Sequence, residues 1–117
     1  MFLTDTQEKR RFYRIKFSNP VLFQSLNEQD FGGSVACDIS EGGIKLNLPQ
    51  FIPVGTELSL QIEFSKDNVC HCTGKVKWVE VLPLVERHRV GIEFEGIDSP
   101  IGFKKELQHR VKLASLY

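Results

Sequence analysis

The feature that most constrains the fold is a strict alternation of apolar and polar residues from Glu57 to Phe64. Its apolar members fall on one side of an extended chain: Leu58, Leu60, Ile62 and Phe64. This is the period of a strand with one face in a core and the other in water. A single strand cannot bury that face, so partner strands of the same kind are required.

Five further segments show the same alternation or the same apolar content. Turn-forming residues separate them, including Asn27 to Asp30, Pro49 to Thr56 and Ser65 to Asn68. Asn19-Pro20 interrupts the first segment and predicts a bulge or an edge position there. The predicted strands, including Glu57 to Phe64, are 14–23, 31–38, 44–48, 57–64, 69–82 and 88–94.

The last part of the chain has a helical pattern. Asp98-Ser99 before Pro100 is a helix start, with a capping side chain ahead of proline at the first helical position. An apolar stripe follows at spacings of four, four and three: Phe103, Leu107, Val111 and Ala114. Most of the helix's four cations fall on the predicted wet side: Lys104, Lys105, Arg110 and Lys112. We therefore predict a mainly β protein, a six-stranded antiparallel barrel with a C-terminal helix over 99–115.

The 117 residues fit one domain, which we place at 12–117 behind a flexible N-terminal arm at 1–11. No apolar run approaches the ~20 residues that span a bilayer, and the first residues do not form a signal peptide. Three cysteines, an odd number, fit a reducing compartment better than a disulfide framework. The expected location is the cytoplasm.

The formal net charge is zero, from 15 basic and 15 acidic residues, which argues against a general nucleic-acid binder. The cations are concentrated, however, at the start of the chain: Lys9, Arg10, Arg11, Arg14 and Lys16. Arginine offers a planar fork of donors that matches a phosphate or the edge of guanine. The cluster indicates a small anionic ligand, although basic residues near a terminus are also found merely solvated.

A second distinctive stretch runs from Asp38 to Gly43 and reads Asp-Ile-Ser-Glu-Gly-Gly. Asp38 and Ser40 are residues that bond to their local backbone, and Gly42 and Gly43 are suited to a positive φ between two strands. A turn alone explains these residue types. The alternative is a site in which Asp38 accepts from a base edge or orients an arginine, Ser40 donates to a phosphate, and Gly43 admits a ligand closely.

Cys70-His71-Cys72 is the one short motif that invites a metal interpretation. Neighbouring strand residues point to opposite faces, and the chain has no Cys-x-x-Cys partner, so we expect no metal site. No nucleophile with an adjacent base is apparent, and we expect no enzyme activity.

Arg-x-x-x-Arg at 10–14 and Asp-x-Ser-x-x-Gly at 38–43 together resemble the signature of the PilZ domain family. The later segments Gly74 to Trp78 and Val90 to Phe94, and the terminal helix, are similar to that family as well. The resemblance implies a six-stranded barrel that is a receptor for the bacterial second messenger cyclic di-GMP. It implies ligand contacts from five residues, all of which match the signature: Arg10, Arg14, Asp38, Ser40 and Gly43.

Four more residues are secondary candidates for this ligand: Lys9, Arg11, Gly42 and Trp78. Lys9 and Arg11 bring the cations of residues 9–14 to four, which would balance the four phosphates of two stacked ligand molecules. Trp78 either packs in or against the barrel or stacks on a guanine.

The expected function is therefore a receptor or adaptor whose arm and surface change on binding cyclic di-GMP and signal to a further protein. Two alternatives remain: an adaptor of the same fold that binds no nucleotide, and a small oligonucleotide-binding barrel. Zero net charge weighs against the second alternative. A hydrolase of the messenger is disfavoured because no metal or base constellation is apparent.

Overall fold

The computed structural model describes residues 14–27 and 30–115. Within these ranges, seven strands and one helix follow in chain order: β1 (Ile15–Lys16), β2 (Pro20–Ser25), β3 (Phe31–Ile39), β4 (Gly43–Leu48), β5 (Glu57–Ser65), β6 (Asn68–Leu82), β7 (Arg87–Ile97) and α2 (Pro100–Ser115). The predicted flexible arm at 1–11 lies outside the described residues. No helix in the described ranges is long and apolar enough to cross a membrane.

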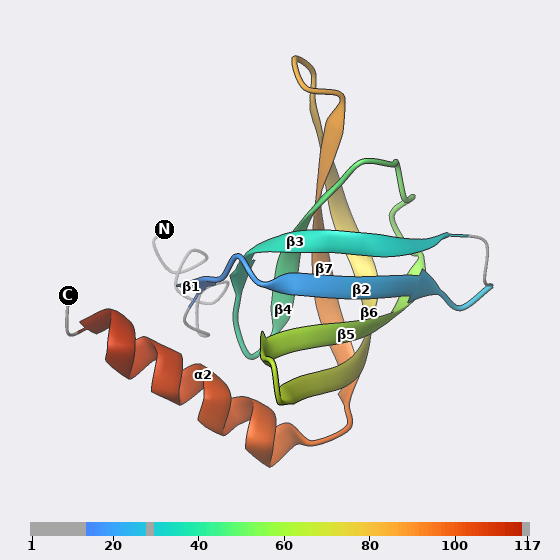
Figure 1. The fold of residues 1–117 in the computed structure, drawn as a ribbon. Coiled ribbons are helices and arrows are strands. Elements are labelled where there is room, and N and C mark those ends of the chain that lie inside the picture. The colour runs from blue at the N-terminus through green and yellow to red at the C-terminus, as the bar shows by residue number, and fades with distance from the viewer. Residues whose placement is uncertain (1–13, 28–29, 116–117) are drawn as a thin grey trace, which may run out of the picture.

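Six strands close into an antiparallel barrel in the order β3, β2, β5, β6, β7, β4, with β4 returning to pair with β3 (Figure 1). β1 lies outside this ring and pairs only with the end of β3, at Ile15↔Ile39 and Lys16↔Asp38. The prediction of a six-stranded barrel with a C-terminal helix is confirmed. The additional short strand is the detached first part of the predicted segment 14–23.

The break between β1 and β2 falls where Asn19-Pro20 predicts it. Proline has no backbone N–H to give to a ladder, and the chain there is held partly by a side chain instead. The Asn19 amide donates to the carbonyls of Glu63 and Phe64, at 2.9 and 3.1 Å. Backbone bonds from Phe17 to Cys37 and from Ala36 to Asn19 keep the broken segment alongside β3.

The alternation at Glu57 to Phe64 becomes β5, whose four apolar residues are all fully or almost fully buried. Their counterparts from the other strands and the β4–β5 loop fill the same interior, including Val21, Leu46, Ile52, Val76 and Val90, each fully buried. Burying a side chain of this size stabilises the fold by about 1.5–3 kcal/mol. The barrel interior is therefore the hydrophobic core and offers no room for a ligand-sized channel.

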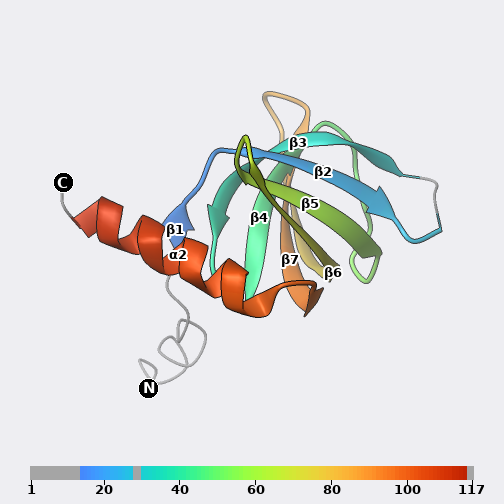
Figure 2. The same cartoon turned by 60° about the horizontal axis from the view of Figure 1, so that its bottom comes forward.

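α2 begins as predicted, with Ser99 accepting the first helical bond from the Phe103 amide at 2.9 Å. Phe103 and Leu107 are buried, and the Phe103 ring meets Phe64 and Phe94 at centroid distances of 5.6 and 5.4 Å. The helix thereby covers one end of the barrel and runs beside β1 (Figure 2).

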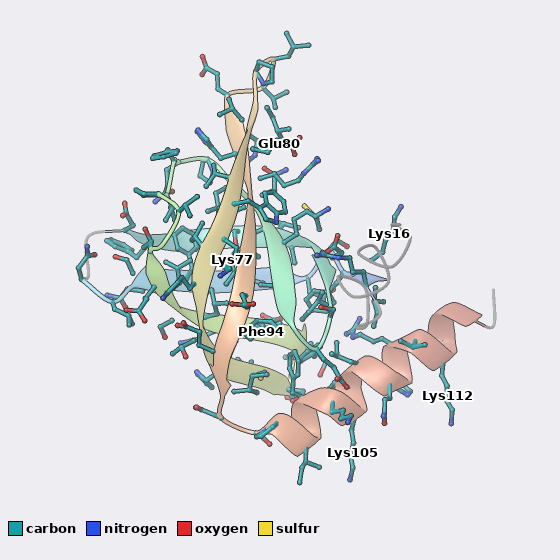
Figure 3. All side chains as sticks on the ribbon, turned by 180° about the vertical axis from the view of Figure 1, so that it is seen from behind. Lys16, Lys77, Glu80, Phe94, Lys105 and Lys112 are labelled. Atoms are coloured by element: carbon teal, nitrogen blue, oxygen red, sulfur yellow. The ribbon has the colours of Figure 1, made fainter. Side chains whose placement is uncertain are left out.

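Arg110 is the exception among the four cations of α2, because it is half-buried against the barrel. Its guanidinium lies 5.0 Å from the Phe17 ring centroid and 5.6 Å from that of Phe64, and it donates to the Phe64 carbonyl. A guanidinium can cover an aromatic face and reach a carbonyl at once, which lysine cannot do as well. Lys105 and Lys112 do project away from the barrel, as expected (Figure 3).

Candidate functional site

Asp38 is the centre of a charged group on the outer wall of the barrel. Its Oδ1 lies 2.9 Å from Nη1 of Arg14, and its Oδ2 lies 3.0 Å from Nζ of Lys45. The Asp38 side chain is only 17% exposed, whereas that of Arg14 is 54% exposed. One carboxylate thus holds two cations, leaving a local excess of positive charge and a guanidinium still accessible to a ligand.

A β-bulge aims Asp38 at this position. The β3–β4 register shifts between Ala36 and Asp38, so that two residues lie between the buried Ala36 and the buried Ile39 instead of one. Both intervening residues, Cys37 and Asp38, are half-buried rather than alternating between core and solvent. Bulges commonly redirect a side chain in this way.

The turn after β3 is held by Ser40. Its Oγ accepts from the backbone amides of Gly42 and Gly43, at 3.2 and 3.3 Å, and Ser40 itself is buried. The Ser40 amide donates to the Gly43 carbonyl at 2.9 Å, and the Phe94 amide donates to the Gly42 carbonyl at 2.9 Å. The hydroxyl therefore shapes the turn and β7 anchors it, while a contact from Ser40 to a phosphate stays a prediction.

The expectation of a positive φ at Gly42 or Gly43 was wrong. Among the described glycines only Gly55 has one, at 93°. Gly43 is required for a different reason, because a Cβ there would lie 2.3 Å from the backbone oxygen of Ile92. The backbones of β4 and β7 are too close at this point for any side chain.

Trp78 belongs to the same outer wall. Cross-strand pairing produces a row of neighbours that runs through β1, β3, β4, β7 and β6: Lys16, Asp38, Lys45, Gly91 and Trp78. The indole lies on Gly91, where a Cβ would be 2.2 Å from the ring, and Trp78 is 38% exposed. Trp78 therefore packs against the outside of the barrel, and stacking on a guanine remains a prediction.

The structure thus brings five of the predicted site residues onto one region of the wall and its adjoining turn: Arg14, Asp38, Ser40, Gly42 and Gly43. Trp78 stands at the other end of the row. The remaining candidates, Lys9, Arg10 and Arg11, lie outside the described residues.

Sequence analysis did not identify Lys45 as a site residue. It lies between the buried Ile44 and Leu46, so its outward direction follows from the alternation of the strand. Its contact with Asp38 required knowledge of the β3–β4 pairing. Of the two described cations that contact Asp38, Lys45 lies within a strand, whereas Arg14 lies in the chain leading into β1.

The Cys70-His71-Cys72 motif lies away from this wall and belongs to the core. Cys70 and Cys72 are buried, and His71 points outward as an exposed residue. Burial raises the pKa of the Cys72 thiol to about 12, with Cys70 and Asp98 adding to the shift. Within residues 14–27 and 30–115, no group of three His, Cys, Asp or Glu side chains is placed to hold a metal ion.

Several solved structures share this fold at low sequence identity. Bacillus subtilis inhibitor of motility, MotI/DgrA, aligns over 90% of this chain and 51% of its own, at 19% identity and a TM-score of 0.75. The K. pneumonia MrkH–c-di-GMP complex aligns over 91% and 54%, at 18% identity and 0.76. The present chain therefore spans about half the length of these proteins.

A shorter structure, the PilZ domain with c-di-GMP of YcgR from Escherichia coli, aligns over 91% of this chain and 98% of its own, at 16% identity and a TM-score of 0.61. No curated protein matches the sequence significantly. The family model of the PilZ domain, in contrast, matches residues 8–112, which include the whole barrel and most of α2. This chain therefore belongs to the PilZ domain family.

Proposed function

We propose that this protein is a receptor for cyclic di-GMP and not an enzyme. The observation that carries the proposal is the Arg14–Asp38–Lys45 group on the outer wall, at the motif positions of a family in which the similar MrkH and YcgR structures contain that ligand. The group offers a cationic, partly exposed surface without an assembled nucleophile or metal cluster in the described ranges.

The geometry favours one of the two roles considered for Asp38. Both of its carboxylate oxygens are already engaged, by Arg14 and Lys45, so the carboxylate orients cations rather than offering both oxygens to a guanine edge. An oriented guanidinium loses less conformational freedom on binding a phosphate or a guanine bidentately. Lys45 adds a point charge that a phosphate would meet on the same wall.

Ligand binding also involves the arm in this proposal. Arg10, with Lys9 and Arg11, leads directly into Arg14, which is already anchored to Asp38. Closing these cations around the ligand orders the arm against the wall and changes the charged surface there. That changed surface is the signal to a downstream protein.

We propose further that two stacked ligand molecules bind per chain. The four phosphates of such a pair match the four cations at Lys9, Arg10, Arg11 and Arg14. The Trp78 indole packs on Gly91 and is partly exposed. It is therefore suited to stack on one of the guanines.

Isothermal titration calorimetry with cyclic di-GMP tests the site and the stoichiometry together. Arg14→Ala, Asp38→Ala and Lys45→Ala should each weaken binding at least about tenfold, since each removes a charge-assisted contact or its support. Lys66→Ala is the matched control, because Lys66 is an exposed cation in the β5–β6 turn. Thermal unfolding should change little, because ion pairs at a protein surface contribute about 0–1 kcal/mol.

Several results would contradict the proposal. Unaltered affinity in the Asp38 and Arg14 variants would refute the site, and one bound ligand per chain at saturation would refute the stacked pair. Effective competition by GTP or cyclic AMP would refute the specificity. Single-stranded DNA binding with a steep salt dependence would favour the oligonucleotide-binding alternative.

A further inference from the structure

The β6–β7 hairpin extends beyond the barrel and leaves one side of β6 open. β5 pairs with β6 only as far as Glu57↔Lys75, and the loop after β4 adds bonds at Val76. From Trp78 to Leu82, β6 pairs with β7 on one side, and no described strand pairs with its other side. Figure 1 shows this part of the hairpin projecting at the end of the barrel opposite α2.

The middle of the open edge has little of the usual protection against pairing with another chain. Exposed edges are commonly guarded by lysine, proline or inward-pointing charge. Here Lys77 and Pro83 stand only at the two ends, and the five residues between them read Trp-Val-Glu-Val-Leu, with Glu80 as the single charged residue among them. Glu80 is visible on the projecting part of the hairpin in Figure 3, and its Oε1 lies 3.4 Å from Nη1 of Arg89 on β7.

Apolar side chains extend around this edge and over the hairpin tip. Leu84 is 96% exposed, and Val81 and Val85 are each 59% exposed. The loop between β4 and β5 adds two more exposed apolar residues, Phe51 and Val54, and the Phe51 ring contacts His88 of β7. Several exposed apolar side chains gathered at one end of the molecule are typical of an interaction surface.

We propose that a second copy of this chain pairs with this edge, antiparallel and about a two-fold axis at Glu80. In that register Val79 of each copy lies opposite Val81 of the other, and Trp78 lies opposite Leu82. Every directly opposed pair except the central one is then apolar on both sides, which is the favourable arrangement for cross-strand neighbours. The five-residue ladder also satisfies backbone groups of both edges.

The central pair is balanced by Arg89. Two glutamates opposite one another would repel, but each is already paired with Arg89 of its own hairpin. The four side chains at the axis therefore carry no net charge. When the axis passes through Val79 instead, Trp78 opposes Glu80, which places an apolar side chain opposite a charged one.

The hairpin tips are covered in the same arrangement. Leu82 of one copy lies opposite Trp78 of the other. Beyond Leu82, the hairpin tip of the first copy therefore extends past Trp78 of the second copy toward its Val76. The loop carrying Val54 and Gly55 lies there, because the Gly55 amide donates to the Val76 carbonyl at 2.8 Å. Leu84 and Val85 of each copy thereby meet the exposed Val54 and Phe51 of the other. An isologous interface of this kind closes on itself as a dimer.

Sedimentation velocity of the full chain over roughly 5–500 µM tests the proposal, since so small an interface is expected to dissociate in the micromolar range. The sole tryptophan, Trp78, gives a second readout, because its emission should shift to the blue as it is covered. Glu80→Lys places four cations at the axis and should raise the dissociation constant at least about tenfold.

The charge-swapped protein Glu80→Lys with Arg89→Glu restores a neutral group and should return the dissociation constant to within about threefold of the original. Leu22→Lys is the control, an exposed apolar residue on β2 that should leave the dimer intact. A monomer at all concentrations overturns the proposal. So does a dimer insensitive to Glu80→Lys, or one that the charge swap does not restore.

Discussion

Replacing Gly43 with alanine separates a structural role from a ligand-binding role at one motif position. Gly43 is the first residue of β4 and pairs with Glu93 of β7. An alanine Cβ would lie 2.3 Å from the Ile92 oxygen and 3.3 Å from its carbonyl carbon, and both are backbone atoms that no rotamer change can move. The two strands must separate by roughly 1 Å before the contact becomes ordinary.

The expected cost follows from that separation. Overpacking of this size costs about 1–3 kcal/mol, and weakening a ladder bond, such as that from the Phe94 amide to the Gly42 carbonyl, adds about 1 kcal/mol. We expect Gly43→Ala to lower the free energy of unfolding by about 3 kcal/mol. For a domain of this size that corresponds to a fall in Tm of about 12 °C.

Urea and thermal unfolding followed by circular dichroism measure this difference. Gly33→Ala is the matched control, because a Cβ at Gly33 meets only a Leu22 side-chain atom at 3.7 Å, an ordinary contact. Cyclic di-GMP titration well below the Tm completes the experiment. If Gly43→Ala is as stable as Gly33→Ala, the close-approach reasoning is refuted; weaker binding with unaltered stability would then assign Gly43 to the ligand.

Two further predictions concern the core and the helix. Because burial raises the Cys72 pKa from 9.0 to about 12, the unfolded thiol loses its proton in that range while the folded one keeps it, so stability falls as pH rises. Cys72→Val should make this fall shallower by up to about 1.4 kcal/mol per pH unit in urea titrations, and an identical slope would contradict the assignment. Arg110→Ala should destabilise the fold by about 1–3 kcal/mol through its lost contacts with Phe17 and Phe64, whereas the exposed neighbour His109→Ala should change stability by less than about 0.5 kcal/mol.

The strands and the helix were largely predictable because local patterns dictate them. The alternation of β5 and the Ser99-Pro100 helix start depend only on residues close in sequence. The split of β1 from β2 was likewise indicated by Asn19-Pro20. The position of Arg110 could not be predicted, because its partners Phe17 and Phe64 approach it only through tertiary packing.

The site was predictable as a motif but not as an arrangement. Asp38 follows a bulge in β3 that the regular alternation of a strand does not predict. Another bulge, between Val76 and Trp78, turns the indole outward. A regular strand would place Trp78 on the same buried face as Val76. The position of Lys45 beside Asp38 depends on the pairing of β3 with β4, which the sequence alone does not reveal. Gly43 was identified correctly as a constrained position, but the constraint comes from β7 rather than from a turn dihedral.

The chain just after Arg14 and the turn after β3 both contact α2, which makes this helix the element best placed to respond to the ligand. Three residues after Arg14, Phe17 is buried beneath Arg110, and Glu41 in the turn lies 3.8 Å from Nζ of Lys104. A ligand that fixes Arg14 and the turn together removes motions that would otherwise loosen these helix contacts. Hydrogen exchange should therefore slow in α2 on adding cyclic di-GMP and stay unchanged at the tip of the β6–β7 hairpin, which projects from the end of the barrel opposite α2 (Figure 1). Equal exchange in α2 with and without bound ligand would show that the helix is not coupled to the site.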